Sequence, residues 1–282
     1  MSLYILGFYH RHLYFYHLAI VILYRYPLFT LKLCLLIPLL ALFAQAQFCQ
    51  AKEGFNFYTY HNKPPYLFST QRSQEQAGGL YRAYVKYLNA QQQDFSIKLV
   101  FLPRLRLNRE LTQGTLQGAV LGVNPVWFND RDKTKYLWAG AFMADKDVLV
   151  VKRGLAFPYA APRDLTERSL ALPRGAYFFG VSELIAAGKI TAFETSSELQ
   201  NLEMVEFKRV DATIMSLLTA KYFLSHQFKS SLFEILKVPH DTYQRQVLFP
   251  KSQSRVFNKL VKIINQSFTD PVWLAELKKL SD

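Results

Sequence analysis

A run of apolar residues at positions 33–43 ends in small residues rather than in charged ones. Lys32 precedes this run, and Ala44-Gln45-Ala46 and Cys49-Gln50-Ala51 follow it. A basic flank, an apolar run of about 7–15 residues and a small-residue end are typical of a secretory signal peptide. A membrane span needs about 20 apolar residues. The pattern therefore predicts that residues 1–51 are a leader, cleaved near Ala46 or Ala51, and that the rest of the chain is exported.

The segment before this run does not fit a simple leader. Residues 1–30 are rich in Tyr, Phe, Leu and Ile, with Arg11 and Arg25 as their fixed charges. In one interpretation, translation starts downstream, between residues 21 and 30. In the other, residues 13–46 form an uncleaved membrane anchor. N-terminal sequencing of the native protein distinguishes the two.

Beyond the leader, segments in which apolar residues recur at every second position alternate with segments in which they recur about every 3.6 positions. The first period is typical of strands and the second of helices. Apolar side chains at Leu80, Tyr84, Tyr87 and Leu88 share one face of a helix. In this half of the chain we expect strands at 55–60, 97–102 and 119–122, and a second helix at 105–113.

The second half of the chain repeats this alternation. Thr195 and Glu198 have the spacing of a capping box, which predicts a helix to about residue 207. Asp270 followed by Pro271 indicates another helix start. We expect strands at 147–152, 169–172, 211–215, 232–238 and 246–249, and helices over about 176–187, 216–224, 256–264 and 271–280. Strands alternating with helices favour a parallel α/β sheet.

Composition narrows the possible functions. Both cysteines, Cys34 and Cys49, lie in the predicted leader, so the exported part depends on core packing rather than on disulfides. The chain has 34 Lys and Arg against 21 Asp and Glu, a formal net charge of +13. The charges are scattered, which argues against nucleic acid as a partner. A basic surface without a specific partner and an anionic small-molecule ligand remain as alternatives.

Five short patterns occur in a defined order after the leader. They are Lys63-Pro64-Pro65-Tyr66 ahead of Gly79, Pro103-x-x-Arg106-x-x-x-x-Leu111-x-x-Gly114, residues 131–152, Asp164-Leu165 ahead of Arg174-Gly175, and Arg209-Val210-Asp211-Ala212. In this order, they resemble the bacterial extracellular solute-binding proteins of family 3, the periplasmic receptors for polar amino acids and related solutes.

The resemblance implies an α/β protein of the type II periplasmic binding fold. It would have two lobes, each a mostly parallel sheet flanked by helices, joined by two crossover hinge strands. We expect lobe 1 at 52–149, lobe 2 at 150–247 and a C-terminal return to lobe 1 at 248–282. Closure of the lobes around a small solute would be its mode of action.

Ligands of open α/β sheets bind beyond the carboxyl ends of the strands, so the loops after strands hold the candidate residues. The Lys63 ammonium, beside aromatic rings, suits an anionic or planar solute. In the family an Arg after the third strand grips a carboxylate, and Arg131 is the nearest match. Arg174 lies at a helix start, where backbone N–H groups favour anions. The candidate ligand-binding residues are Tyr60, Lys63, Tyr66, Asn124, Trp127, Arg131, Arg174, Gly175, Tyr177 and Ser216.

Two positions depart from the family pattern. Asn124 to Trp127 replace a Ser/Thr-rich turn. Ser216 stands where amino-acid-specific members carry an acid that holds the solute ammonium. A site that is basic and aromatic, with no evident acid, favours a solute with an anionic group and little positive charge, or a modified amino acid.

Catalytic motifs do not appear in the sequence: G-x-S-x-G, H-E-x-x-H, a P-loop and a dinucleotide-binding fingerprint are all missing. We therefore expect a monomeric receptor in the periplasm that is not an enzyme. It would have no catalytic residues, metal or cofactor, and would serve ABC-type uptake or sensing with an inner-membrane permease or sensor as partner.

A dehydratase-like enzyme on the same fold and a tethered sensory module are the alternatives. A buried acid with a raised pKa in the cleft would favour the enzyme; Asp130 and Glu183 are its candidates.

Overall fold

The computed structural model describes residues 52–68 and 78–281. The predicted leader, residues 1–51, and its two cleavage positions lie outside the described residues. From Glu53 onward the chain forms one compact unit. Among the described residues, no helix combines the length and apolar character that a membrane span requires.

One nine-stranded sheet runs through the described residues in the order β2-β1-β3-β9-β4-β7-β5-β6, with β8 paired to β4. Its strands are β1 (Glu53–Thr59), β2 (Phe95–Phe101), β3 (Ala119–Val123), β4 (Leu137–Lys152), β5 (Ser169–Pro173), β6 (Thr191–Thr195), β7 (Ala212–Ser216), β8 (Phe233–Ile235) and β9 (Asp241–Phe249). β1 is parallel to β2 and β3, and β5 is parallel to β6 and β7. The two long strands, β4 and β9, pair antiparallel in the middle of the sheet.

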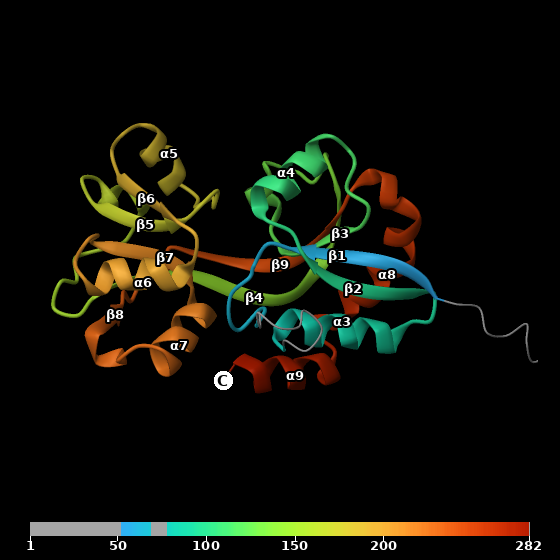
Figure 1. Ribbon diagram of the computed structural model, residues 1–282. Helices are drawn as coiled ribbons and strands as arrows, with labels where there is room; N and C mark the ends of the chain where they lie inside the picture. Colours follow the sequence, from blue (N-terminus) through green and yellow to red (C-terminus); the bar gives the residue numbers. More distant parts are fainter. Residues whose placement is uncertain (1–51, 69–77, 282) are drawn as a thin grey trace, which may run out of the picture. The chain divides into compact units, whose positions relative to one another are not determined.

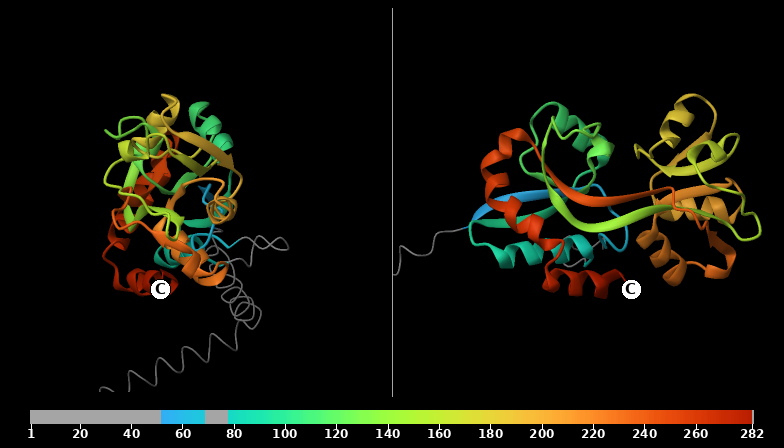
Figure 2. Two further views of the ribbon diagram at one scale, coloured as in Figure 1. Left: turned by 90° about the vertical axis from the view of Figure 1, so that its left-hand side faces the viewer. Right: turned by 180° about the vertical axis from the view of Figure 1, so that it is seen from behind.

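Helices cover the sheet in two groups, one on each side of this central pair (Figure 1). We call the group around β1–β3 the first lobe; its helices are α3 (Leu80–Gln91), α4 (Arg104–Thr112), η1 (Pro125–Phe128), η4 (Lys251–Gln253), α8 (Ser254–Ser267) and α9 (Pro271–Ser281). The group around β5–β8 is the second lobe; its helices are η2 (Pro162–Leu165), α5 (Val181–Ala186), α6 (Glu198–Glu206), α7 (Leu217–His226) and η3 (Ser230–Leu232). Seen from behind, β4 and β9 run side by side from one lobe to the other (Figure 2).

Each lobe buries apolar side chains on both faces of its part of the sheet. In the first lobe, Phe57 and Leu121 face α3, α8 and α9, whereas Val120 and Leu248 face α4. In the second lobe the same alternation divides β4, β5 and β7 between a core beneath α5 and a core beneath α6 and α7. Burial on both faces explains why several of these strands read as continuous apolar runs.

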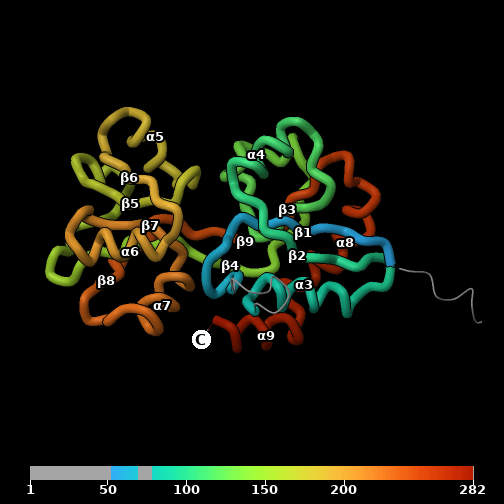
Figure 3. Tube along the Cα trace, viewed as in Figure 1, coloured from blue at the N-terminus to red at the C-terminus, as the bar shows by residue number. Residues whose placement is uncertain are grey.

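The chain returns to the first lobe at its C-terminal end, and α9 packs beside α3 (Figure 3). The two-lobed α/β fold with two crossover strands is thus confirmed. The lobe boundaries expected from the sequence, at residues 149/150 and 247/248, stay predictions.

Some expected elements differ from the structure. The helix expected over 176–187 begins only at Val181, because Gly180 adopts a left-handed backbone conformation with φ of 72° that interrupts it. Helix α6 is capped by Ser197 rather than by Thr195, so the expected capping box is wrong. β6 was not expected at all, since it is a largely exposed edge strand without an apolar run.

Candidate functional site

Four polar side chains project from one face of the crossover strands. β4 carries Asp145 and Asp147, and β9 carries Tyr243 and Arg245. Asp145 lies directly opposite Tyr243 in the antiparallel register. Alternate residues of a strand share a face, so all four point to the same side of the sheet. We call these four residues the hinge cluster.

Arg245 is the centre of the hinge cluster. Its side chain is 1% exposed and forms an ion pair with Asp145 at 3.0 Å. Nη1 donates to the carbonyl oxygen of Gly122 at 2.9 Å and to the Tyr81 hydroxyl at 3.2 Å, and Nη2 donates to the Tyr243 hydroxyl at 3.1 Å. A guanidinium has five N–H donors, and partners surround this one on all sides. Arg245 therefore organises the base of the cleft and is not available to a solute.

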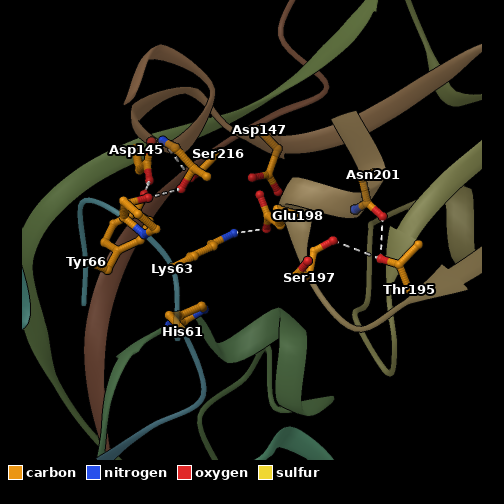
Figure 4. A network of polar contacts seen from close by, with 12 residues as sticks. His61, Lys63, Tyr66, Asp145, Asp147, Thr195, Ser197, Glu198, Asn201 and Ser216 are labelled. Carbon is orange, nitrogen blue, oxygen red and sulfur yellow. Dashed lines mark hydrogen bonds and ion pairs between the residues drawn. The ribbon is translucent and has the colours of Figure 1, made fainter. Parts of the chain in front are cut away.

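The loop after β1 reaches across the hinge cluster. Tyr66 is fully buried, its hydroxyl donates to Asp145, and the Arg245 guanidinium lies 4.2 Å from its ring centre. Lys63 does not point to solvent: its ammonium forms an ion pair with Glu198 of the second lobe (Figure 4). The structure therefore places Lys63 in the cleft, but already paired with an acid.

An aromatic group lines the first-lobe wall. The imidazole of His61 lies 4.1 Å from the Tyr60 ring and 6.1 Å from the Trp127 ring, centre to centre. Burial, with neighbouring cations, lowers the pKa of His61 well below its usual range, so this imidazole is neutral at pH 7. The guanidinium of Arg104 lies over two rings, 4.7 Å from the centre of Tyr60 and 4.1 Å from that of Phe128.

The other first-lobe candidates have different surroundings. The Asn124 side chain accepts from the backbone N–H of Val126 at 3.0 Å and donates to the carbonyl oxygen of Gln244 at 3.3 Å, which is a capping role. Arg131 is exposed, and its guanidinium lies 5.8 Å from the ring centre of Phe179 in the second lobe. Arg131 thus lies at the rim of the cleft.

In the second lobe, two candidates face residues of their own lobe. Arg174 is 64% exposed and pairs with Glu194 at 3.5 Å. The Tyr177 hydroxyl donates to Glu183 at 2.8 Å. The structure does not bring the Arg174 side chain together with the hinge cluster.

Contacts between the lobes close the cleft at two places. Ser216 is 1% exposed and caps α7. The hydroxyl of Thr219, one turn later, donates to the carbonyl oxygen of Pro64 at 2.8 Å. At the opposite side, a Cβ atom on Gly175 would lie 3.3 Å from the Leu105 side chain. Because Gly175 has no side chain, the backbone of its loop can come close to the start of α4.

Two carboxylates that were not among the predicted site residues lie in the cleft. Asp147 is 8% exposed and Glu198 is 6% exposed, and their side chains point toward each other (Figure 4). Burial raises the pKa of Asp147 to about 7; Lys63, the Tyr243 hydroxyl and Arg245 all act in the opposite direction. The second oxygen of Glu198 is buried without a hydrogen-bond partner among the described residues.

Of the two acids proposed from the sequence for an enzyme, Asp130 has a structural role. It is 3% exposed and accepts hydrogen bonds from three backbone N–H groups and from the Trp138 indole. Burial raises its pKa, but these four bonds outweigh burial, so the pKa lies below its ordinary value. Glu183 accepts from Tyr177 at an exposed position. Asp147 fits the criterion of a buried acid with a raised pKa; burial also raises the pKa of Asp241, opposite it on β9, but Asp241 is only partly buried.

A hollow of about 500 Å³ lies beside the same strands. Its lining combines Asp145 and Tyr243 of the hinge cluster with Leu217 and Leu218 of α7 and with Ala144, Lys146, Thr242 and Gln244. The last four residues alternate with the hinge cluster along β4 and β9, so most of the strand positions that line the hollow belong to the opposite face. We place the candidate site in the cleft because the charged and aromatic side chains converge there.

Within the part of the chain that the structure describes, no group of three or more His, Cys, Asp and Glu side chains could hold a metal ion.

The raised pKa of Asp147 predicts a pH-dependent stability. This carboxyl ionises near 3.8 in an ordinary environment and near 7 in the folded protein. Between these values the native state holds more protons than the unfolded state, so the free energy of unfolding falls as pH rises from about 4 to about 7, by up to about 1.4 kcal/mol per pH unit. Asp147→Asn should remove this dependence and raise the free energy of unfolding near pH 8 by roughly 1–3 kcal/mol.

Urea unfolding across this pH range measures the effect. The control is Asp132→Asn, an acid at an exposed position, which should retain the wild-type pH dependence. Equal slopes for the wild type and Asp147→Asn would contradict the assignment.

The fold and the cleft define a two-lobed protein of the type II periplasmic binding fold. No protein-family model matches the chain, and no curated protein matches it. Solved structures do match. An ancestral arginine-binding protein bound to arginine superposes with a TM-score of 0.66 at 13% identity, over 81% of this chain and 98% of the other.

Two further structures extend the comparison. The GluR0 ligand-binding core in complex with L-glutamate gives a TM-score of 0.62 at 11% identity, covering 83% of this chain and 97% of that one. An ancestral amino acid-binding protein described as a precursor of cyclohexadienyl dehydratase gives 0.61 at 17% identity, covering 81% and 96%. The family resemblance seen in the sequence is thereby confirmed at the level of the fold. Binding proteins dominate these matches, and the dehydratase precursor shows that the fold does not exclude catalysis.

Proposed function

We propose that this protein binds a small polar solute, anionic or amino-acid-like, between its two lobes. The observation that carries the proposal is the arrangement around Arg104. Its guanidinium lies over Tyr60 and Phe128, with Nη2 donating to the carbonyl oxygen of Trp127 at 2.5 Å. The Gly175 loop of the opposite lobe approaches the same helix start. A guanidinium positioned over aromatic rings beside the opposite lobe suits a carboxylate or a similar anion.

The chemistry of the cleft also limits the size and type of the solute. Aromatic rings at Tyr60 and Trp127 offer apolar surface, and the charged groups near them offer a few directional contacts. This combination is typical of sites for small polar molecules. Arginine and L-glutamate, the ligands of two of the similar structures, are of this size. In the wider proposal the protein is a periplasmic monomer, with a permease or a sensor of the inner membrane as its partner.

Asp147 favours a second candidate function. A buried carboxyl with a pKa of about 7 is suited to proton transfer near neutral pH. On a fold shared with a precursor of a dehydratase, it makes an enzyme the alternative. Incubating the protein with its solute and analysing the mixture by mass spectrometry distinguishes the two. Conversion that disappears in Asp147→Asn while binding persists would favour the enzyme, and an unchanged solute would favour the receptor.

Thermal unfolding with a panel of amino acids, acylated amino acids, dicarboxylates and small peptides tests the binding function. A ligand at about 100 times its Kd stabilises the folded state by about 2.7 kcal/mol. We expect at least one compound with a carboxylate to raise the unfolding midpoint. Arg131→Ala and Arg174→Ala then test the two sequence candidates. We expect the larger loss in the first, because Arg131 lies beside Phe179 of the opposite lobe whereas Arg174 pairs with Glu194 of its own lobe. If no compound of the panel shifts the midpoint, the receptor proposal fails for these solute classes.

A further inference from the structure

Lys63 and Glu198 join the two lobes across the cleft. Lys63 comes from the loop between β1 and α3, and Glu198 is the first residue of α6. Their side chains are 18% and 5% exposed, so the ion pair is well shielded from water. Beside it, the Thr219 hydroxyl binds the carbonyl oxygen of Pro64 at 2.8 Å. The segment from 63 to 64 is thus fixed to the starts of two second-lobe helices.

Two buried carboxyl groups, those of Glu198 and Asp147, lie near the Lys63 ammonium. Glu198 uses one oxygen for Lys63, and its other oxygen is buried without a partner among the described residues. Asp147 points at Glu198 (Figure 4), and Lys63 is the cation with the largest effect on the pKa of Asp147. Glu198 therefore takes its cation from the other lobe, and the same ammonium acts on Asp147 together with Arg245 and the Tyr243 hydroxyl. A buried carboxylate without a cation is unfavourable, so this position requires a positive charge.

We propose that Lys63 is an internal cation of the cleft: its ammonium takes the place that the positive group of a solute would occupy against Glu198 and Asp147. It thereby holds the lobes together without a solute and restricts the site to solutes that lack a positive charge at that point. The role of Lys63 in solute specificity rests on the proposed solute-binding function. The ion pair of Lys63 and Glu198 that joins the lobes, which we call the latch, does not depend on that function. An unaminated dicarboxylate or an N-acylated amino acid fits this site better than a free amino acid does.

Removing the ammonium should open the unliganded protein. Lys63→Met keeps most of the side-chain stem and removes its charge. We expect a larger radius of gyration in small-angle X-ray scattering for this variant than for the wild type, both without ligand. Lys86→Met removes an exposed lysine of the same lobe and should leave the wild-type scattering curve unchanged.

A second variant keeps this test decisive if Lys63→Met folds poorly. Glu198→Gln removes the other charge of the pair with little change in shape, and it should open the protein in the same way. The charge exchange Lys63→Glu with Glu198→Lys should restore the smaller radius. Wild-type scattering from folded Lys63→Met or Glu198→Gln protein would overturn the latch.

Ligand preference tests the second part of the inference. Glutarate and L-glutamate carry the same two carboxylates and differ in the ammonium group. We expect the wild type to bind glutarate more tightly than L-glutamate. In Lys63→Met the ratio of the two dissociation constants should shift at least about tenfold in favour of L-glutamate, which corresponds to about 1.4 kcal/mol of binding free energy. An unchanged ratio overturns the specificity role. If neither protein binds either compound, the choice of solute fails, and the scattering result alone decides on the latch.

Discussion

Arg245→Met is expected to destabilise the protein by about 3–5 kcal/mol, because it leaves Asp145 buried without its cation. The ion pair is 3.0 Å long, and its two side chains are 1% and 2% exposed. The hydroxyls of Tyr81 and Tyr243 and the carbonyl oxygen of Gly122 lose a charged donor at the same time. Urea unfolding monitored by circular dichroism measures the change.

A double-mutant cycle separates the ion pair from the other contacts of Arg245. Replacing a whole buried pair by apolar residues costs less than removing one partner. The variant Arg245→Met with Asp145→Leu should therefore be less destabilised than the sum of the two single variants. A loss below about 1 kcal/mol for Arg245→Met alone would contradict the role of this side chain at the base of the cleft.

Trp273→Ala is expected to cost about 3–5 kcal/mol as well, because it opens a large cavity in the first-lobe core. Trp273 is fully buried, its ring centre lies 4.8 Å from that of Tyr84, and its indole N–H donates to the carbonyl oxygen of Phe142 at 2.6 Å. Trp273→Phe retains most of the ring. We expect this variant to lose about 1 kcal/mol of unfolding free energy for the missing hydrogen bond, and less for packing than Trp273→Ala loses.

The neighbouring residue provides the matched control for this prediction. Leu274 follows Trp273 on the same helix and is 42% exposed. Leu274→Ala should change the free energy of unfolding by about 0.5 kcal/mol or less. Similar losses for Trp273→Ala and Leu274→Ala would show that α9 does not anchor the C-terminal return of the chain.

Much of the fold could be predicted from the periodicity of apolar residues. Helix α3 was visible because Leu80, Tyr84 and Leu88 all fall on its buried face. The middle of β4 was visible because residues 147–152 are mostly apolar. Its first ten residues, 137–146, were not, because this stretch crosses between the lobes and carries Asp145 and Lys146. The edge strand β6 was missed since it has little burial to mark it.

The loops that surround the candidate site could also be predicted, but the charged residues of the hinge cluster could not. Tyr60, Lys63, Tyr66 and Trp127 all lie at the cleft or at its base. Arg245 was missed because a buried arginine is uncommon and looks like a surface residue in the sequence. Its partner Asp145 precedes it by 100 residues, and only the antiparallel register of β4 and β9 brings them together.

Glu198 shows how a local pattern can conceal a long-range contact. The sequence presented it as part of a capping box with Thr195. In the structure, Ser197 caps the helix, the Thr195 hydroxyl binds Asn201, and Glu198 turns to Lys63 of the other lobe. Nothing in the local spacing indicates a partner 135 residues away.

Calorimetric titration of the best compound of the panel into the wild type and two arginine variants tests the central claim most directly. Arg104 lies over the aromatic rings of the cleft, whereas Arg106, two residues later on the same helix, is 61% exposed and pairs with Glu110. The account predicts saturable binding to the wild type, at least about tenfold weaker binding to Arg104→Gln, and unchanged binding to Arg106→Gln. Equal affinities of the wild type and Arg104→Gln would contradict solute binding at this place in the cleft.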